Sequence, residues 1–319
     1  MTNLVPVTVL TGYLGAGKTT VLNRILSEKH GQRYAVIVNE FGEIGIDNDL
    51  VIDADEEVFE MNNGCVCCSV RGDLIRILGN LMKRKDRFDG ILVETTGLAD
   101  PGPVAQTFFV DANLNARTRL DAIVTVADAK YLLDRLADSH EAEEQIAFAD
   151  VILLNKTDLV SERELATVES RIRSINPYAQ LHHTVRGRID LQYILDRRAF
   201  DLDRILKLEP DFLHHGHHHH HSDVASVALS TDKPLDADKL VGWLQELTQT
   251  KGGDILRLKG ILSLKNHDRR FVVQGVHMML DADHQLPWKP EEKRQSRLVF
   301  IGRKLDGKAL QQSFASCEA

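Results

Sequence analysis

The chain has 319 residues, of which 43% are hydrophobic and 27% charged, with a formal net charge of −8. This length and composition predict a soluble globular protein with one large domain or two ordinary ones. The negative balance, without a long basic run, argues against nucleic acid as a partner. No apolar run reaches the roughly 18 residues that a membrane span needs. The apolar start at Leu4–Leu14 lacks a basic leader, so it is not expected to be a signal peptide.

The first predicted elements are a strand at Val5–Leu10, the sequence GYLGAGKT at residues 12–19 and a helix at Thr20–Glu28. The middle sequence fits GxxxxGK[ST], a phosphate-binding loop whose glycines let several N–H groups converge on one phosphate. Lys18 would reach the β and γ oxygens of a nucleotide, and the Thr19 hydroxyl would bind Mg²⁺. The other residues expected to contact the nucleotide are Gly12, Gly15, Ala16, Gly17 and Thr20. A glycine-rich turn that binds nothing is the alternative.

A second strand is predicted at Tyr34–Asn39, and the acidic loop Glu40–Asp47 follows it. In a phosphate-loop domain, segments that sense the nucleotide usually lie here. The acids of this loop, Glu43 among them, are candidate ligands for Mg²⁺ or a transition metal. An ordinary solvated loop is the alternative.

Three cysteines lie together at Cys65, Cys67 and Cys68, too close for a disulfide framework. Such a cluster suggests a reducing cytosol and a transition-metal site, with Zn²⁺ as the first choice and Co²⁺ or Cu⁺ also acceptable. Because strand side chains alternate between faces, all three thiols converge only if the backbone turns after Cys67. Closed structural zinc sites usually have two cysteine pairs, so a single cluster favours an exchangeable metal. Buried cysteines without a metal are a further alternative.

The next elements are an amphipathic helix at Asp73–Lys83 and a strand at Ile91–Val93 that ends at Glu94. Glu94 would hold Mg²⁺ or its water, and the Gly97 N–H would sense the terminal phosphate. Lys18, Glu94 and Gly97 are therefore the predicted catalytic residues.

Strands at Asp121–Ala127 and Asp150–Leu154 follow, and the second leads into NKTD at residues 155–158. The Asp158 carboxylate would accept two hydrogen bonds from guanine that adenine cannot offer, which selects GTP over ATP. Asn155 would brace the loop and Lys156 would lie over the base. The pattern predicts an α/β fold, a phosphate-loop domain with a mostly parallel sheet covered on both faces, that hydrolyses GTP to GDP and phosphate. A kinase is disfavoured because nothing marks a phosphate acceptor site.

The segment 209–223 is the predicted linker between a domain at 1–208 and a smaller α+β domain at 224–319, with helices on one face of an antiparallel sheet. The linker is rich in histidine, and His214, His215, His217 and His218 are candidate weak metal ligands. An expression tag is the alternative, although the run is internal. The C-terminal domain is predicted to have strands at Val224–Ser230, Ile255–Leu264, Arg270–Met278 and Arg297–Ile301, and helices at Asp236–Leu247 and Asp306–Phe314. It shows no catalytic constellation: His267, His277, His284 and Trp288 are expected at the surface or packed, and Cys317 as a lone thiol.

The phosphate loop, NEFGE at 39–43, GCVCC at 64–68, ETTGLADP at 94–101 and NKTD at 155–158 occur in one order. In this the chain resembles the CobW family of P-loop GTPases over both domains, and CxCC is the most specific part. The resemblance implies a GTP-driven metallochaperone or metal insertase that binds its ion through the three cysteines and handles Mg²⁺-GTP at the other motifs. The cysteine usage predicts a cytoplasmic location. It also implies that residues 69–72 lie near the nucleotide. The family spans several metals and clients.

The resulting hypothesis is that GTP and Mg²⁺ order Glu40–Asp47 and the cysteine segment, so that zinc binds in the GTP state and is released to a metalloprotein client after hydrolysis. Cobalt is the alternative cargo. The rival functions are a zinc buffer that uses the histidine run and a GTPase with a permanent structural zinc. GTP, GDP, the metal ion and an unidentified client are the expected partners. A nucleotide-dependent homodimer is a candidate assembly, and the sequence leaves the oligomeric state open.

Overall fold

A computed structural model of the chain describes residues 4–28, 31–39, 58–61, 68–83, 88–196, 224–288 and 292–319. The chain divides into two compact units, Met1–Ile172 with Tyr178–Ala199 and Arg173–Pro177 with Phe200–Ala319. The predictions for Glu40–Asp47, Cys65, Cys67 and the histidine run lie outside the described residues. Among the described residues, no helix has the length and apolar character to cross a lipid bilayer.

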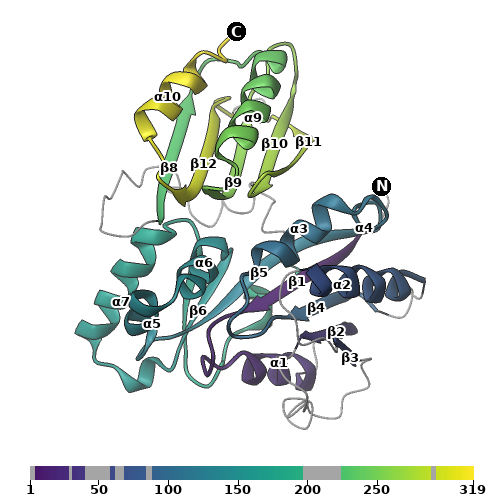
Figure 1. Cartoon of the computed structure of the whole chain (residues 1–319), viewed down its shortest axis with the longest axis vertical. Coiled ribbons are helices and arrows are strands. Elements are labelled where there is room, and N and C mark those ends of the chain that lie inside the picture. Colours follow the sequence, from purple (N-terminus) through teal and green to yellow (C-terminus); the bar gives the residue numbers. More distant parts are fainter. Residues whose placement is uncertain are drawn as a thin grey trace. The chain divides into compact units, whose positions relative to one another are not determined.

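The described strands of the first unit form one parallel sheet in the order β3-β2-β4-β1-β5-β6-β7 (Figure 1). Because parallel strands end at the same edge of a sheet, the loops after them meet there. β1 lies between β4 and β5, so its loop has a strand end on each side. The bounds are β1 (Val5–Thr11), β2 (Tyr34–Asn39), β3 (Val58–Met61), β4 (Gly90–Glu94), β5 (Thr118–Asp128), β6 (Val151–Asn155) and β7 (Gln180–Thr184).

Helices cover both faces of this sheet, as the sequence predicted. On one face, Val21 and Leu22 of α1 pack with Val124 and Val126 of β5 in a single apolar cluster. Thr125 lies between those two valines and therefore points to the other face, where its hydroxyl donates to the Gln145 carbonyl of α6 over 2.7 Å. The helices are α1 (Lys18–Ser27), α2 (Cys68–Leu81), α3 (Gly102–Val110), α4 (Ala112–Asn115), α5 (Leu132–Asp138), α6 (His140–Phe148) and α7 (Glu162–Ile175), with short 3-10 turns η3 (Thr157–Leu159) and η4 (Leu191–Tyr193).

The predicted strands at β1, β2, β4, β5 and β6 are confirmed, with ends that differ by a few residues. The larger difference is α2, which begins at Cys68 and not at Asp73. Apolar spacing at Leu74, Leu78 and Leu81, all buried, located the helix. The preceding residues carry no such spacing, so periodicity could not find its first turn.

The second unit contains a five-stranded antiparallel sheet in the order β11-β10-β9-β12-β8. Leu240 and Leu244 of α9 and Leu310 and Phe314 of α10 share one apolar cluster with the strands, so both helices cover one face, as predicted. Trp288 is buried, and Cys317 is a buried free thiol. The elements are β8 (Val224–Thr231), α9 (Ala237–Lys251), β9 (Ile255–Leu262), β10 (Arg269–Val276), β11 (Met279–Pro287), β12 (Ser296–Arg303) and α10 (Gly307–Ala315).

The sequence missed β11 and extended β10 too far. His277 adopts φ 52° and begins the turn that separates the two strands, so the predicted strand Arg270–Met278 is wrong at its end. The polar run Asp281 to Gln285 concealed β11, which pairs with β10 as the edge strand of the sheet.

Candidate nucleotide-binding site

The backbone of the phosphate loop requires glycine at three positions. Gly12, Gly15 and Gly17 have φ values of 140°, 74° and 108°, a region that other residues rarely enter. A Cβ on Gly12 would lie 2.1 Å from the Val126 carbonyl oxygen. α1 begins at Lys18, directly after Gly17, and has no side-chain cap within the described residues. Its first N–H groups therefore suit an anion.

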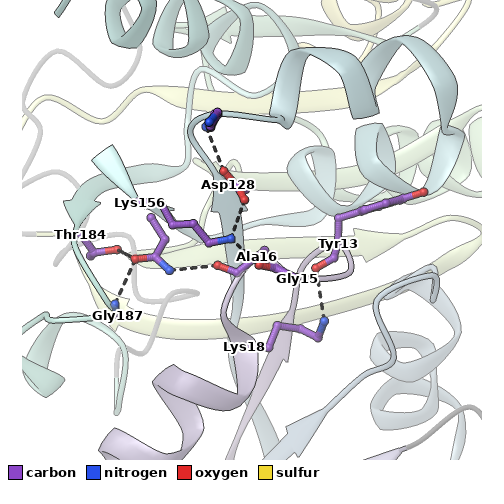
Figure 2. Close-up of polar contacts among 10 residues, drawn as sticks. Tyr13, Gly15, Ala16, Lys18, Asp128, Lys156, Thr184 and Gly187 are labelled. Atoms are coloured by element: carbon purple, nitrogen blue, oxygen red, sulfur yellow. Dashed lines mark hydrogen bonds and ion pairs between the residues drawn. The ribbon is translucent and has the colours of Figure 1, made fainter. Parts of the chain in front are cut away.

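Lys18 lies across the loop that precedes it. Its side chain is buried, and Nζ donates to the Gly12 carbonyl oxygen over 2.9 Å. Nζ also donates to the Tyr13 carbonyl oxygen over 3.4 Å (Figure 2). The ammonium group is thus held by the same loop that would surround the phosphates. Thr20 follows in the first turn of α1.

Thr19 and Glu94 join the start of α1 to the end of β4. The Thr19 hydroxyl donates to Glu94 Oε1 over 3.3 Å, and Glu94, which pairs in register with Leu10 of β1, is 5% exposed. A hydroxyl and a carboxylate are the hard oxygen ligands that Mg²⁺ prefers. The residues present therefore fit a magnesium ion.

The loop after β4 lies directly against the phosphate loop. A Cβ on Gly97 would be 2.7 Å from the Leu14 backbone nitrogen, so only glycine allows this approach. The buried Gln145 of α6 fixes the loop from the other side, because its Nε2 donates to the carbonyl oxygens of Gly97 and Ala99, each over 3.1 Å.

Asn155, at the end of β6, connects two loops. Its Nδ2 donates to the Ala16 carbonyl over 2.9 Å, while Oδ1 accepts from Thr184 Oγ1 and the Gly187 N–H, each over 3.0 Å. The side chain is 2% exposed, and both its nitrogen and its oxygen are hydrogen-bonded inside the protein.

Lys156 extends from the same strand end along the phosphate loop. Its backbone is left-handed, with φ 62°, and Nζ donates to the Gly15 carbonyl and pairs with Asp128 Oδ2, both over 2.7 Å (Figure 2). Asp158 lies in η3, one turn further, and is exposed. Asn155 and Lys156 therefore hold the phosphate loop, while the Asp158 side chain is exposed to solvent.

Four residues that shape this site were not predicted. Asp128 was visible in the sequence as an acid at a strand end, but nothing there indicated Lys156 as its partner. Thr184 is the last residue of β7, Gly187 lies in the loop after it, and Gln145 lies within α6. None of these three carries a motif, because each acts through a contact with a residue distant in the sequence.

Of the predicted transition-metal ligands, Cys68 lies within the described residues, as the first residue of α2. Cys65, Cys67, Glu43, His214, His215, His217 and His218 lie outside the described residues. Within the described part of the chain, no group of three or more His, Cys, Asp or Glu side chains is arranged to hold a metal.

The fold and these motifs define a P-loop GTPase: a glycine loop before α1, an acid at the end of the adjacent strand and NKTD two strands away at the same edge. The chain belongs to the CobW/HypB/UreG family. Residues 6–183 match its nucleotide-binding domain, and residues 224–318 match the family model described as the cobalamin synthesis protein cobW C-terminal domain.

Curated relatives that match almost the whole chain include two bacterial zinc chaperones. The zinc chaperone YjiA of Escherichia coli is 36% identical over 318 residues, with 98% of each chain covered. The zinc chaperone CobW of Pseudomonas aeruginosa is 36% identical over 340 residues, covering 96% of this chain and 89% of the relative. Among solved structures, that of Zn(II)-bound YjiA GTPase from E. coli aligns with a TM-score of 0.78 at 32% identity and covers 99% of both chains.

Proposed function

We propose that this protein is a GTP-dependent zinc metallochaperone: it binds zinc through Cys65, Cys67 and Cys68 in the GTP state and delivers it to a metalloprotein client. The observation that carries the proposal is the place of the two elements that flank these cysteines in the chain, β3 and α2. Relatives named zinc chaperones support zinc as the metal. Cobalt remains the alternative cargo.

The cysteines lie in the sequence between β3, a strand of the parallel sheet, and α2. β3 ends at Met61, which pairs with Asn39 of β2, and the adjacent Val38 pairs with Glu94 of β4. α2 begins at Cys68. β3, which precedes the cysteines in the sequence, therefore ends at the same edge of the parallel sheet as β1, which precedes the phosphate loop. In this proposal a change of nucleotide at that edge alters the spacing of the thiolates.

In this proposal the nucleotide is bound by the loop at residues 12–19, with Lys18 on the β and γ oxygens and Asp158 on guanine. Thr19 and Glu94 would hold Mg²⁺, which when bound neutralises phosphate charge. The Gly97 N–H would detect the terminal phosphate, and the Gln145 hydrogen bonds hold the loop that carries it.

The coupling between nucleotide and metal is reciprocal. If zinc binds more tightly when GTP is bound, then GTP must bind more tightly, by the same factor, when zinc is bound. Hydrolysis would loosen the thiolate site and release the ion to the client. In this scheme residues 1–208 form the GTPase domain, 209–223 a histidine-rich linker with weak metal sites, and 224–319 a separate C-terminal domain.

The central experiment measures zinc affinity by competition with a chromophoric chelator, with Mg²⁺ and either a non-hydrolysable GTP analogue or GDP. We expect at least ~10-fold tighter zinc binding with the analogue, which lies within the usual range of coupling. Cys67→Ala should abolish the tight site, whereas Cys317→Ala, the matched control, should retain it. Equal affinity in the two nucleotide states would refute the coupling.

Two further measurements separate the rival functions. Deleting residues 214–221 should leave one tight zinc per chain, whereas a zinc buffer would lose most of its capacity. If the zinc were structural, Cys67→Ala would lower the melting temperature as strongly as metal removal does. A chaperone should keep its fold in this variant and lose only transfer.

Base selection is tested at Asp158. Asp158→Asn exchanges the carboxylate for an amide whose N–H₂ suits the 2-carbonyl of xanthine and not the 2-amine of guanine. We expect affinity for GTP to fall by at least ~100-fold and affinity for xanthosine triphosphate to rise. Size measurements with each nucleotide would test the homodimer.

A further inference from the structure

A cavity of about 250 Å³ lies between the first half of the phosphate loop and the helices α5 and α6. It is bordered by Gly15 on one side, by the end of β5 on another, and by residues of both helices. Gly17, Lys18, Thr19 and Glu94 are not among its lining residues. The cavity therefore adjoins the phosphate-binding face of the loop without coinciding with it.

The chemistry of the cavity wall is mixed. Its floor is apolar, with Val126, Leu132 and Ile146 among the lining residues, and its charged residues are Asp128, Lys156 and Arg135. Since Asp128 and Lys156 pair with each other over 2.7 Å, one positive charge is left over. The lining matches a ligand with an apolar body and a single negative charge.

Arg135 supplies the remaining charge. It is exposed, and its guanidinium lies 5.4 Å from the centroid of the Tyr13 ring. Among the described residues it forms no ion pair, so its side-chain donors are available to an anion. The volume is slightly below the usual range for drug-sized ligands, roughly 300 to 1,000 Å³, and suits a small molecule.

The wall of the cavity is physically connected to the nucleotide site at two points. Gln145 lines the cavity and donates to the carbonyl oxygens of Gly97 and Ala99 in the loop after β4. Gly15, which also lines it, accepts from Lys156. Tyr13 and Lys156 lie on either side of Gly15 in Figure 2. A ligand in the cavity would thus contact groups that set the position of both loops around the γ-phosphate.

We propose that this cavity is an effector site for a small organic monoanion with an aromatic or branched apolar body. The anion binds at Arg135, the apolar body packs on Val126, Leu132 and Ile146, and occupancy alters nucleotide exchange through Gln145 and Gly15. The site needs neither zinc nor hydrolysis, so it goes beyond the proposed zinc function.

The test uses the full chain loaded with fluorescent GDP and the probe 3-phenylpropanoate, titrated by ligand-observed NMR. We expect saturable binding with a dissociation constant of about 1 mM or below, as for a ligand of roughly ten non-hydrogen atoms. The uncharged 3-phenylpropanol should bind at least ~10-fold more weakly, because it lacks the charge-assisted hydrogen bonds. Saturation should change the GDP release rate by at least ~5-fold.

Two variants test the location. Arg135→Ala, at an exposed position, should weaken the probe at least ~10-fold, and Ala142→Leu, which adds volume to the cavity wall, should abolish binding. Arg163→Ala, an exposed arginine on α7, is the matched control and should change nothing. Melting temperature and GDP affinity without the probe establish that each variant is folded.

The proposal is overturned if the probe does not bind, if it binds folded Arg135→Ala and Ala142→Leu as well as the parent chain, or if saturation leaves GDP release unchanged. A peptide that ends in phenylalanine with a free carboxylate carries the same phenyl and carboxylate groups, but at the end of a polypeptide. Binding of the peptide in place of the free acid would overturn a small-molecule site. None of these outcomes depends on the zinc experiments.

Discussion

Asn155 and Ala16 lie 139 positions apart in the sequence, yet the Asn155 side-chain amide donates to the Ala16 carbonyl over 2.9 Å. The same side chain accepts hydrogen bonds from Thr184 and Gly187. One buried amide therefore fixes the phosphate loop relative to the loop after β7. The shape of the nucleotide site depends on this connection.

We expect Asn155→Ala to lower both the stability and the nucleotide affinity. The change leaves buried hydrogen-bonding groups without partners, which costs roughly 1 to 3 kcal/mol. GTP and GDP affinities should fall together by at least ~10-fold, measured with fluorescent analogues. Asn113→Ala, at an exposed position on α4, is the control. Unchanged affinity in a folded Asn155→Ala chain would show that the amide supports the fold alone.

The Asp128–Lys156 pair predicts a measurable coupling. Both side chains are partly shielded from solvent, at 12% and 32% exposure. A double-mutant cycle with Asp128→Asn and Lys156→Ala should give a coupling energy of about 1 kcal/mol in GDP binding. Additive effects of the two changes would mean that the ion pair does not position Lys156. Asp138→Asn, an exposed acid on α5, serves as the control.

The Thr19–Glu94 contact predicts a shared dependence on magnesium. Thr19→Ala and Glu94→Gln should each raise the Mg²⁺ concentration for half-maximal GTP hydrolysis by at least ~10-fold, because each removes or weakens one oxygen ligand. The double variant should be less impaired than the sum of the two effects, since both groups would serve one ion. Glu162→Gln on α7 is the control. An unaltered Mg²⁺ requirement in both single variants would contradict the assignment.

Cys317 predicts a pH dependence of stability. Burial, the largest of several influences, raises the pKa of its thiol. Because the pKa of the thiol is raised in the folded state, the folded state favours the protonated thiol. Its contribution to the free energy of unfolding is therefore full below the unfolded pKa of about 8.5 and is lost as pH rises through the folded pKa. Between about pH 7 and pH 10, the free energy of unfolding measured with urea should fall more for the parent chain than for Cys317→Ala. Parallel curves would exclude this thiol as the source.

Much of the nucleotide site could be read directly from the sequence. The phosphate loop and NKTD are short segments whose chemistry depends on residues a few positions apart, so their spacing is meaningful before the chain folds. The apolar runs that became β1, β2, β4 and β6 were equally clear, because a buried parallel strand needs apolar residues on both faces.

The ends of helices and strands were harder to predict where the apolar residues show no periodic spacing. α2 begins at Cys68, ahead of its apolar repeat, and β11 is a polar edge strand that begins after a left-handed His277. In both cases the surrounding tertiary structure decides the backbone, and local preference does not.

The sequence by itself determined the class of the protein and most of its order of strands and helices, and it predicted which residues contact a phosphate and a guanine, because those features are local in the chain. Only the tertiary structure decided that Asp128 pairs with Lys156, that Gln145 holds the loop after β4, and that a cavity separates α5 and α6 from the phosphate loop. Parallel strands bring their carboxyl ends to one edge of the sheet, so residues far apart in the sequence become neighbours, and no short-range pattern records which of them will meet.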